Sequence, residues 1–338
     1  MQSLKLGFLF FVLWVVIISS ASASFGQSVP SDPALIEAAK RDGEAVWYTM
    51  ESVHIVEILR KKFEETFPFV RVKMFRIRSA DIWNRIAAEA TTGHHVFDVA
   101  TTNVATAYAM KKRGFTKPYF PNEGKTLAQA FRDSEGHWYA PTFEGYGIGY
   151  NTRHVKSPPK SYDELLSPAW RGKIALDTQD YDWLGFQLKL RGEKEGLTFM
   201  RELAKNVVMR KGHSLGVQLV AAGEFSAFIN GLASEFFRVK NEGAPVDLIL
   251  TSPLYLGPRA TSLSVKSPHE GAARLLLEWL FSKETARFIT QIGRTSTRGD
   301  IERFPPVLSK VSNFFAHDAA YYENRAHYAK LFNEIFMH

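Results

Sequence analysis

The sequence predicts an α/β protein of two lobes, each with a mixed, mostly parallel sheet flanked by helices. Three successive strand, loop and helix units between residues 44 and 114 favour a parallel sheet with helices on its faces. An extended, glycine-punctuated run at 140–150 follows and leads into a second group of strands and helices. Even without its first 23 residues, the chain of 338 residues exceeds the usual size of one hydrophobic core.

The first residues are typical of a secretory signal peptide. Lys5 supplies a positive charge, residues 6–18 form an almost unbroken apolar run, and Ala21-Ser22-Ala23 offers the small residues that signal peptidase requires. The alternative, an uncleaved membrane anchor, is disfavoured because a membrane-spanning helix needs about 20 apolar residues. We therefore expect cleavage of residues 1–23 after Ala23 and a soluble protein of the periplasm.

Composition excludes several classes of protein. The chain has no cysteine, which rules out a disulfide framework and a lipid-modified N-terminal cysteine. The net charge is +7, but the basic residues are scattered and do not alternate with stacking aromatic residues, so we expect no nucleic-acid partner. A basic surplus favours anionic ligands through the field inside a cleft.

The elements of the first half are predicted from apolar spacing and from the residues that end each run. Ser52 is placed to cap one helix and Pro68 ends it, while Ser79 opens the next helix and Gly93 ends it. The expected elements are helices at 33–42, 53–67, 79–92 and up to about Gly114, with strands at 44–48, 70–77 and 96–100. Ligands bind at the carboxyl ends of strands in such sheets, which predicts a site near 49–52, 76–79 and 100–103.

The run 140–150 is expected to be a strand that crosses into the second lobe. Further expected elements are strands at 173–176, near 207, near 228, at 247–250 and at 261–265, a helix after 182, and helices from 268 to the end. The last two strands are expected to lead the chain back to the first lobe.

Six short motifs follow one another along the chain: Gly43 to Thr49, Phe97 to Thr102, Gly145 to Asn151, Ser167 to Ile174, Val220 to Asn230, and Ser282 to Ala286. Their order resembles that of the type II periplasmic solute-binding proteins of ABC importers, an extracellular solute-binding family that includes the ferric-ion-binding proteins. The resemblance implies two lobes joined by crossing segments that close on a ligand as a hinge. It also implies a monomer that captures a small molecule, hands it to a membrane permease and is not an enzyme. On this basis we expect one lobe at 27–140 plus 262–338 and the other at 141–261.

The resemblance leaves the ligand open. Ferric-binding members place a tyrosine pair shortly after the asparagine equivalent to Asn230, because Fe(III) prefers anionic oxygen donors. Here that stretch carries Phe236 and Phe237, which have no donor atom. We expect a small organic anion, such as a carboxylate, phosphonate or sugar phosphate, with ferric iron as the alternative. His94-His95 is expected to lie in a loop and Tyr321-Tyr322 to pack near the C-terminal helix, so we expect no metal and no cofactor.

Candidate ligand contacts come from helix starts and from the resemblance. Unpaired N–H groups at a helix N-terminus favour an anion, although Ser and Thr there also suit an ordinary N-cap. Arg76 and Arg78 share one face of a strand and are placed either to clamp an anion or to be solvated. The resemblance puts second-lobe contacts at Glu144, Tyr146 and 179–181. The predicted ligand-binding residues are Thr49, Glu51, Ser52, Arg78, Ser79, Thr101, Thr102, Glu144, Tyr146, Gln179, Asp180, Tyr181, Ser214 and Asn230.

One motif favours an enzyme instead. The string Gly212-His213-Ser214-Leu215-Gly216 matches the nucleophile elbow of α/β-hydrolases. The strand before an elbow is buried up to the turn, whereas Arg210 and Lys211 interrupt it here, and no His-Gly-Gly-Gly oxyanion loop precedes it. We therefore expect Ser214 to cap a helix or contact a ligand, and a secreted serine esterase stays the alternative from another class.

Overall fold

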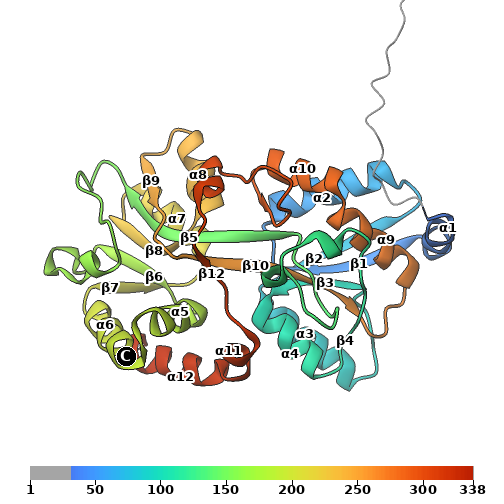
Figure 1. The fold of residues 1–338 in the computed structure, drawn as a ribbon, viewed down its shortest axis with the longest axis horizontal. Coiled ribbons are helices and arrows are strands. Elements are labelled where there is room, and N and C mark those ends of the chain that lie inside the picture. The colour runs from blue at the N-terminus through green and yellow to red at the C-terminus, as the bar shows by residue number, and fades with distance from the viewer. Residues whose placement is uncertain (1–31, 338) are drawn as a thin grey trace, which may run out of the picture.

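The structure is a computed structural model that describes residues 32–337. The predicted signal peptide, residues 1–23, lies outside the described residues. Within 32–337, no helix is both long enough and apolar enough to cross a membrane. A path of hydrogen-bonded strands in the order β2-β1-β3-β10-β5-β8-β6-β7 runs through both halves of the molecule (Figure 1).

The first half is built on three parallel strands, β1 (Glu44–Thr49), β2 (Arg71–Arg76) and β3 (Val99–Asn103), with β1 in the middle. They are flanked by α1 (Pro33–Asp42), α2 (Val53–Thr66), α3 (Ser79–Thr91) and α4 (Val104–Lys112). The three predicted units are confirmed, except that β3 begins at Val99 rather than Val96. The reason lies in Asp98, whose buried carboxylate accepts the Val46 amide at 2.7 Å in place of the backbone of β3.

Two long antiparallel strands, β5 (Thr142–Asn151) and β10 (Leu254–Ser264), cross between the halves side by side (Figure 1). β10 pairs with β3 at one end and with β5 at the other. Tyr146 and Tyr255 face each other in this pair, and their ring centroids lie 5.2 Å apart. The predicted return strand at 261–265 is therefore the end of a longer strand, and the crossing pair is suited to act as a hinge.

The second half is centred on β6 (Ile174–Asp177), which lies parallel to and between β7 (Val207–Arg210) and β8 (Ala227–Leu232). β8 and β9 (Val246–Ile249) pair with β5 in antiparallel fashion. Its helices are α5 (Tyr181–Arg191), α6 (Glu193–Ala204), α7 (His213–Ala222) and α8 (Ala233–Asn241).

After β10 the chain is mostly helical, as predicted. It forms α9 (Glu270–Phe281), α10 (Lys283–Gln291), α11 (Ala319–Glu323) and α12 (Arg325–Phe336), with short strands β11 (Thr295–Ser296) and β12 (Phe314–Phe315). Another short strand, β4 (Thr116–Lys117), follows α4 and pairs with β10. Short 3-10 helices lie at Gly124–Thr126, Gln129–Phe131, Asp163–Leu166, Pro168–Trp170 and Pro306–Lys310. The expected division put all of 262–338 in the first lobe, and this is wrong for α12. That helix packs on α5 and α6 because its apolar face, with Phe332 and Phe336, is buried in the core of the second half. The other expected boundaries stay predictions.

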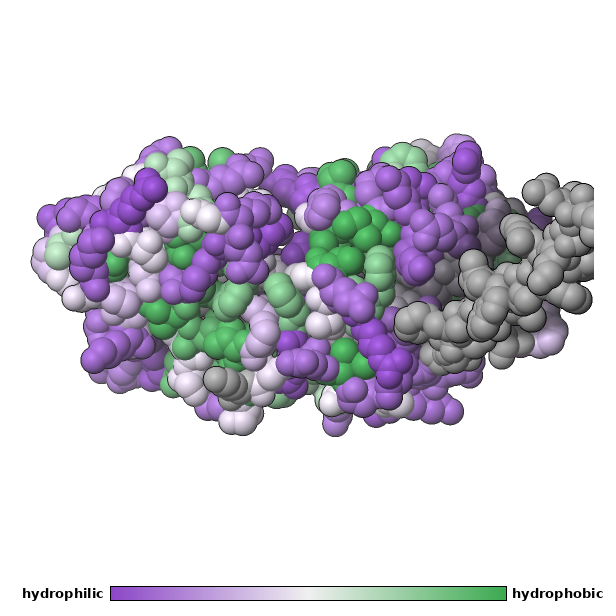
Figure 2. Space-filling view, turned by 90° about the horizontal axis from the view of Figure 1, so that it is seen from above, coloured by the Kyte–Doolittle hydropathy of each residue, from purple (hydrophilic) through white to green (hydrophobic). Residues whose placement is uncertain are grey.

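Buried side chains form separate cores in the two halves, one around Trp47 and one around Trp183. A further cluster of the second half contains Phe236, whose ring reaches within 1.9 Å of the place where a Cβ of Gly149 would stand. The missing side chain at 149 thus makes room for Phe236, which is a core residue. Figure 2 shows a mostly hydrophilic surface with hydrophobic residues in separate patches.

Candidate functional site

Helix starts gather at the carboxyl ends of the strands. α2, α3 and α4 follow β1, β2 and β3, and α5, α7 and α8 follow β6, β7 and β8. The first N–H groups of each helix have no partner within it and carry partial positive charge. These ends favour negatively charged groups, whether from side chains or from a ligand.

Four charged side chains meet beside the crossing strands, and we call them the central cluster: Glu51 after β1, Glu144 on β5, Arg259 on β10 and Arg294 after α10. Glu51 lies between the two arginines, with Oε1 3.4 Å from Arg259 Nε and Oε2 3.6 Å from Arg294 Nε. Arg259 Nη2 also lies 4.0 Å from Glu144 Oε2. These side chains are largely buried, so their charges interact more strongly than they would in water.

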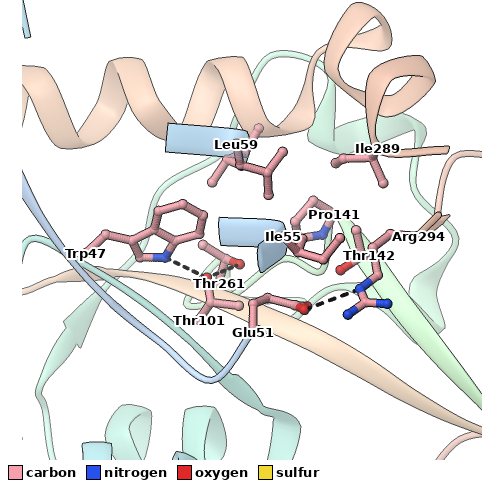
Figure 3. A pocket seen from close by; sticks show the side chains of 11 residues that line it. Trp47, Glu51, Ile55, Leu59, Thr101, Pro141, Thr142, Thr261, Ile289 and Arg294 are labelled. Atoms are coloured by element: carbon pink, nitrogen blue, oxygen red, sulfur yellow. Dashed lines mark hydrogen bonds and ion pairs between the residues drawn. The ribbon is translucent and has the colours of Figure 1, made fainter. Parts of the chain in front are cut away.

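Arg294 connects the starts of α2 and α8. Its Nη2 donates to Ser52 Oγ and to Glu235 Oε1, both at 3.1 Å, and its Nη1 donates to Ser234 Oγ at 2.8 Å. Ser234 in turn donates its amide and its hydroxyl to Glu144, at 3.0 and 2.6 Å. Burial alone would raise the pKa of Glu235, but Arg294 and Arg238 together outweigh it and hold that pKa below its ordinary value. Figure 3 shows Glu51 and Arg294 pointing toward each other. The protein itself therefore uses most of the Arg294 guanidinium.

Arg259 is placed differently. Its carboxylate neighbours stand at ion-pair distances, and its hydrogen bond to Met50 Sδ is long, at 3.8 Å. Apart from Tyr146, which offers a hydrogen bond, most of its N–H groups thus lack a strong acceptor among residues 32–337, although the side chain is only 12% exposed. The side chain of Tyr146 is a neighbour of Arg259. Its ring also lies beside Gly257, where a Cβ would stand 2.7 Å from the ring. A buried guanidinium with free donors is suited to bind an anion.

A second group, the Asp180 cluster, consists of Asp177, Asp180, His213 and Asn230. Asp180 Oδ1 accepts from His213 Nε2 at 3.0 Å and from Asn230 Nδ2 at 2.9 Å. Asp180 Oδ2 and Asn230 Oδ1 are buried and have no hydrogen-bond partner within the described part of the chain. Asn230 has a left-handed φ of 57° and lies at a β-bulge between β5 and β8, a feature that redirects side chains. The ring of Tyr146 lies 5.8 Å from that of His213, so the two clusters adjoin.

The Asp180 and His213 side chains form a buried ion pair at neutral pH. Burial raises the pKa of the Asp180 carboxyl to about 6, although His213 opposes the shift. Burial alone would lower the pKa of His213, but the carboxylates of Asp180 and Asp177 outweigh it and raise the pKa to about 9. Both groups are therefore charged between these two values.

This pair predicts a loss of stability at alkaline pH. Folded His213 holds its proton more tightly than unfolded histidine, whose pKa is 6.5, so its stabilisation is complete below pH 6.5 and is lost as pH rises through 9. We expect the free energy of unfolding to fall by about 2 kcal/mol over this window. Urea titrations at pH 6.5, 8 and 9.5 measure it, and His213→Gln should remove this part of the decline. Equal declines in both proteins would contradict the assignment.

Asp177, Asp180 and His213 also have the side chains to hold a metal ion, with ligand atoms within 4.8 Å of one another. The atoms are already engaged, however. Both oxygens of Asp177 accept backbone amides, from Gln179 at 2.8 Å and from Gly212, and His213 is protonated at neutral pH. A metal would have to displace these bonds and that proton.

Several predicted residues lie in or beside the two clusters: Glu51, Ser52, Glu144, Tyr146, Asp180 and Asn230. Four others are buried in the first half with their hydroxyls in internal hydrogen bonds. Thr49 accepts the Glu51 amide, Ser79 contacts Met50 Sδ, Thr101 bonds to Thr261, and Thr102 donates to a backbone carbonyl. These hydroxyls stabilise the strand ends around Glu51.

Within residues 32–337, no hydrogen bond or ion pair joins a side chain of the remaining predicted residues to a side chain of either cluster. Arg78 pairs with an aspartate on α3 at 2.9 Å, and Arg76 donates to the backbone carbonyl of Glu51 at 3.1 Å. Tyr181 packs edge-on against α12, while Gln179 and Ser214 are exposed. As ligand contacts all of these residues stay predictions.

Sequence reasoning missed Arg259, Arg294 and His213. His213 directly precedes the predicted Ser214 in the hydrolase-like motif, and it is the histidine that points to Asp180. The strand-end rule applied to β7 would have found it, because β7 ends three residues earlier. Arg259 lies inside a strand and Arg294 in a loop after a helix, and no local pattern marks either.

Comparison with known proteins agrees with this architecture. Residues 59–316 match the model of a family described as bacterial extracellular solute-binding protein. The chain is 25% identical over 269 residues to an uncharacterized protein of Haemophilus influenzae, covering 74% of this chain and 76% of that protein. It is 21% identical over 273 residues to the Fe(3+)-binding periplasmic protein of Serratia marcescens, covering 73% and 76%.

Solved structures agree as well. The periplasmic binding protein AfuA from Actinobacillus pleuropneumoniae, with fructose-6-phosphate bound, has a TM-score of 0.78 at 19% identity, covering 87% of this chain and 99% of that one. Iron-bound HitA from Pseudomonas aeruginosa has a TM-score of 0.77 at 15% identity, covering 86% and 99%. At these identities the likeness shows the fold, and the predicted two-lobed α/β class is confirmed.

Proposed function

Because the chain belongs to the family of bacterial extracellular solute-binding proteins, as the order of its motifs indicated, we propose that it captures a small hydroxylated organic anion. The ligand class that fits best is a sugar phosphate. It binds between the two lobes at the crossing strands, and the closed complex delivers it to the membrane permease of an ABC importer. The protein does this in the periplasm and without turnover.

The observation that carries the ligand class is the set of unpaired polar atoms around Tyr146. Arg259 offers N–H donors that lack strong acceptors, which suits a phosphate or carboxylate group. Asp180 Oδ2 and Asn230 Oδ1 are buried acceptors without donors among residues 32–337. A buried polar atom without a partner costs free energy, so a ligand that supplies the missing partners binds well. A ligand with hydroxyl groups at one end can donate to these two oxygens, and an anionic group at its other end can accept from Arg259.

Two features make this class more suitable than a ferric ion. Fe(III) requires anionic oxygens, yet burial raises the pKa of the Tyr146 phenol far above neutrality. Glu144 and Glu51 are already bonded to Ser234 and to the arginines. A serine esterase is also disfavoured, because the exposed Ser214 side chain has no hydrogen bond to a histidine within residues 32–337.

A thermal-shift screen tests the proposal. Fructose-6-phosphate at 100 times its dissociation constant should stabilise the protein by about 2.7 kcal/mol, which raises the melting temperature by several degrees. Fructose carries only the hydroxyl groups and inorganic phosphate only the anionic group. They are the matched controls, and each should raise the melting temperature much less. Stabilisation by ferric citrate alone, with the colour of an iron–phenolate complex, would overturn the proposal. Labelling of Ser214 by a fluorophosphonate would favour the esterase instead.

A further inference from the structure

The segment between β12 and the start of α12, residues 314–325, touches both halves of the molecule, and we call it the strap. It begins on a crossing strand, because β12 pairs in parallel with β10, Phe314 opposite Leu254 and Phe315 opposite Tyr255. From there α11 reaches α4 of the first half, and α12 continues onto α5 of the second (Figure 1). The strap therefore connects two helices that belong to different lobes.

The attachment to the second half is largely buried and has many partners. Asp182, on α5, accepts from Arg325 Nε at 2.6 Å and from the Tyr321 hydroxyl at 2.8 Å, and its backbone carbonyl accepts from His317 Nε2 at 2.7 Å. The Tyr321 ring stacks on His317 and fills the space beside Gly185, where a Cβ would stand 2.2 Å from the ring. Charge-assisted bonds together with close packing make this end a firm anchor.

The attachment to the first half is smaller and partly exposed. The ring of Tyr322 lies 6.1 Å from that of Tyr108 and packs against the first core. Glu323 accepts from the Tyr108 hydroxyl at 2.7 Å and lies 3.5 Å from Lys112 Nζ, both on α4. The Lys112 and Glu323 side chains are 60% and 55% exposed. An ion pair of this kind contributes little on its own and is easily broken.

We propose that the strap is a latch on lobe closure, released at Glu323 and retained at Asp182. A hinge motion that moves α4 away from α5 must break the contacts of Glu323 with Tyr108 and Lys112 and the contact of Tyr322 with Tyr108, because the other end stays bound. The latch thus sets how far the free protein closes and how strongly the closed state is favoured. Its role in ligand capture rests on the proposed function, but its effect on lobe separation does not.

The absence of cysteine from the sequence makes a direct test available. Two introduced cysteines, Lys61→Cys on α2 and Lys194→Cys on α6, carry spin labels whose separation is measured by pulsed electron resonance in the ligand-free protein. Glu323→Lys and Lys112→Glu should each shift the distances toward a more open population, because each puts like charges together. The double variant restores opposite charges and should restore the original distances. Glu334→Lys, which reverses an exposed charge on α12 away from the strap, is the control.

The expected consequence for binding is a loss of about fivefold in the affinity for fructose-6-phosphate in each single variant, recovered in the double variant. Unchanged distances in both single variants, or no recovery in the double variant, would overturn the latch. An equal shift in Glu334→Lys would also overturn it, since the effect would then be one of net charge. If no sugar phosphate binds at all, the proposed function fails while the distances still decide on the latch.

Discussion

Replacing Arg259 with alanine is expected to weaken the binding of fructose-6-phosphate by at least about 100-fold, which corresponds to about 2.7 kcal/mol. The variant loses the largely buried guanidinium whose N–H groups are available to the ligand. It also leaves Glu51 and Glu144 facing the ligand's negative charge. Removing one partner from a desolvated charge pair costs more than the pair itself contributes. Isothermal titration of the folded variant at neutral pH measures the loss.

Two further variants make the result specific. Arg259→Lys keeps the charge but loses the planar fork, so its affinity should fall between those of the wild type and the alanine variant. Arg274→Ala removes an exposed arginine that pairs with Glu270 on α9, and it should leave the affinity unchanged. Wild-type affinity in Arg259→Ala, with a normal melting temperature, would remove this residue from the site. Parallel losses in Arg259→Ala and Arg274→Ala would point to the overall charge instead.

Much of the fold could be predicted because its signals are local. α1 is found at the predicted bounds, since Asp32 caps it and Gly43 ends it in a left-handed conformation. β10 was recognised only over its last residues because Gly257 and Pro258 interrupt the strand pattern. The structure gives the reason for the glycine: the ring of Tyr146 lies where a side chain at 257 would stand. Gly257 makes room for a contact between segments that are distant in the chain, but a glycine within a strand pattern indicates a turn when only the sequence is considered.

The candidate site, like the fold, could be predicted only where its signals are local in the sequence. Glu51 was predicted because it closely follows a strand, and strand ends are where such folds bind ligands. Asp180 was predicted from the family resemblance. Arg259 and Arg294 come to Glu51 only through the pairing of β10 with β3 and through the return of the chain after α10. Glu51 lies more than 200 residues before both arginines along the chain. Such proximity is a property of the tertiary structure and leaves no local pattern.

The segment before β3 offers the largest expected effect on stability. Asp98 is fully buried, and its carboxylate accepts from the Val46 amide at 2.7 Å, the Ser267 hydroxyl at 2.5 Å, the His269 amide at 2.9 Å and His269 Nδ1 at 2.9 Å. These bonds join the first sheet to the start of α9, a helix that supplies much of the first core. Asp98→Ala leaves several buried donors without an acceptor. We therefore expect the free energy of unfolding to fall by about 4 kcal/mol in urea titrations.

The controls for this prediction separate lost hydrogen bonds from lost charge. Asp98→Asn retains one acceptor oxygen and should cost roughly half as much as alanine. Asp300→Ala removes a carboxylate that is 44% exposed and paired with Arg298, and it should cost less than about 1 kcal/mol. Because Asp98 lies away from the central cluster, saturating fructose-6-phosphate should raise the stability of Asp98→Ala by the same amount as that of the wild type. A cost below about 1 kcal/mol would mean that water replaces the carboxylate, and that α9 is held to the sheet by apolar packing alone.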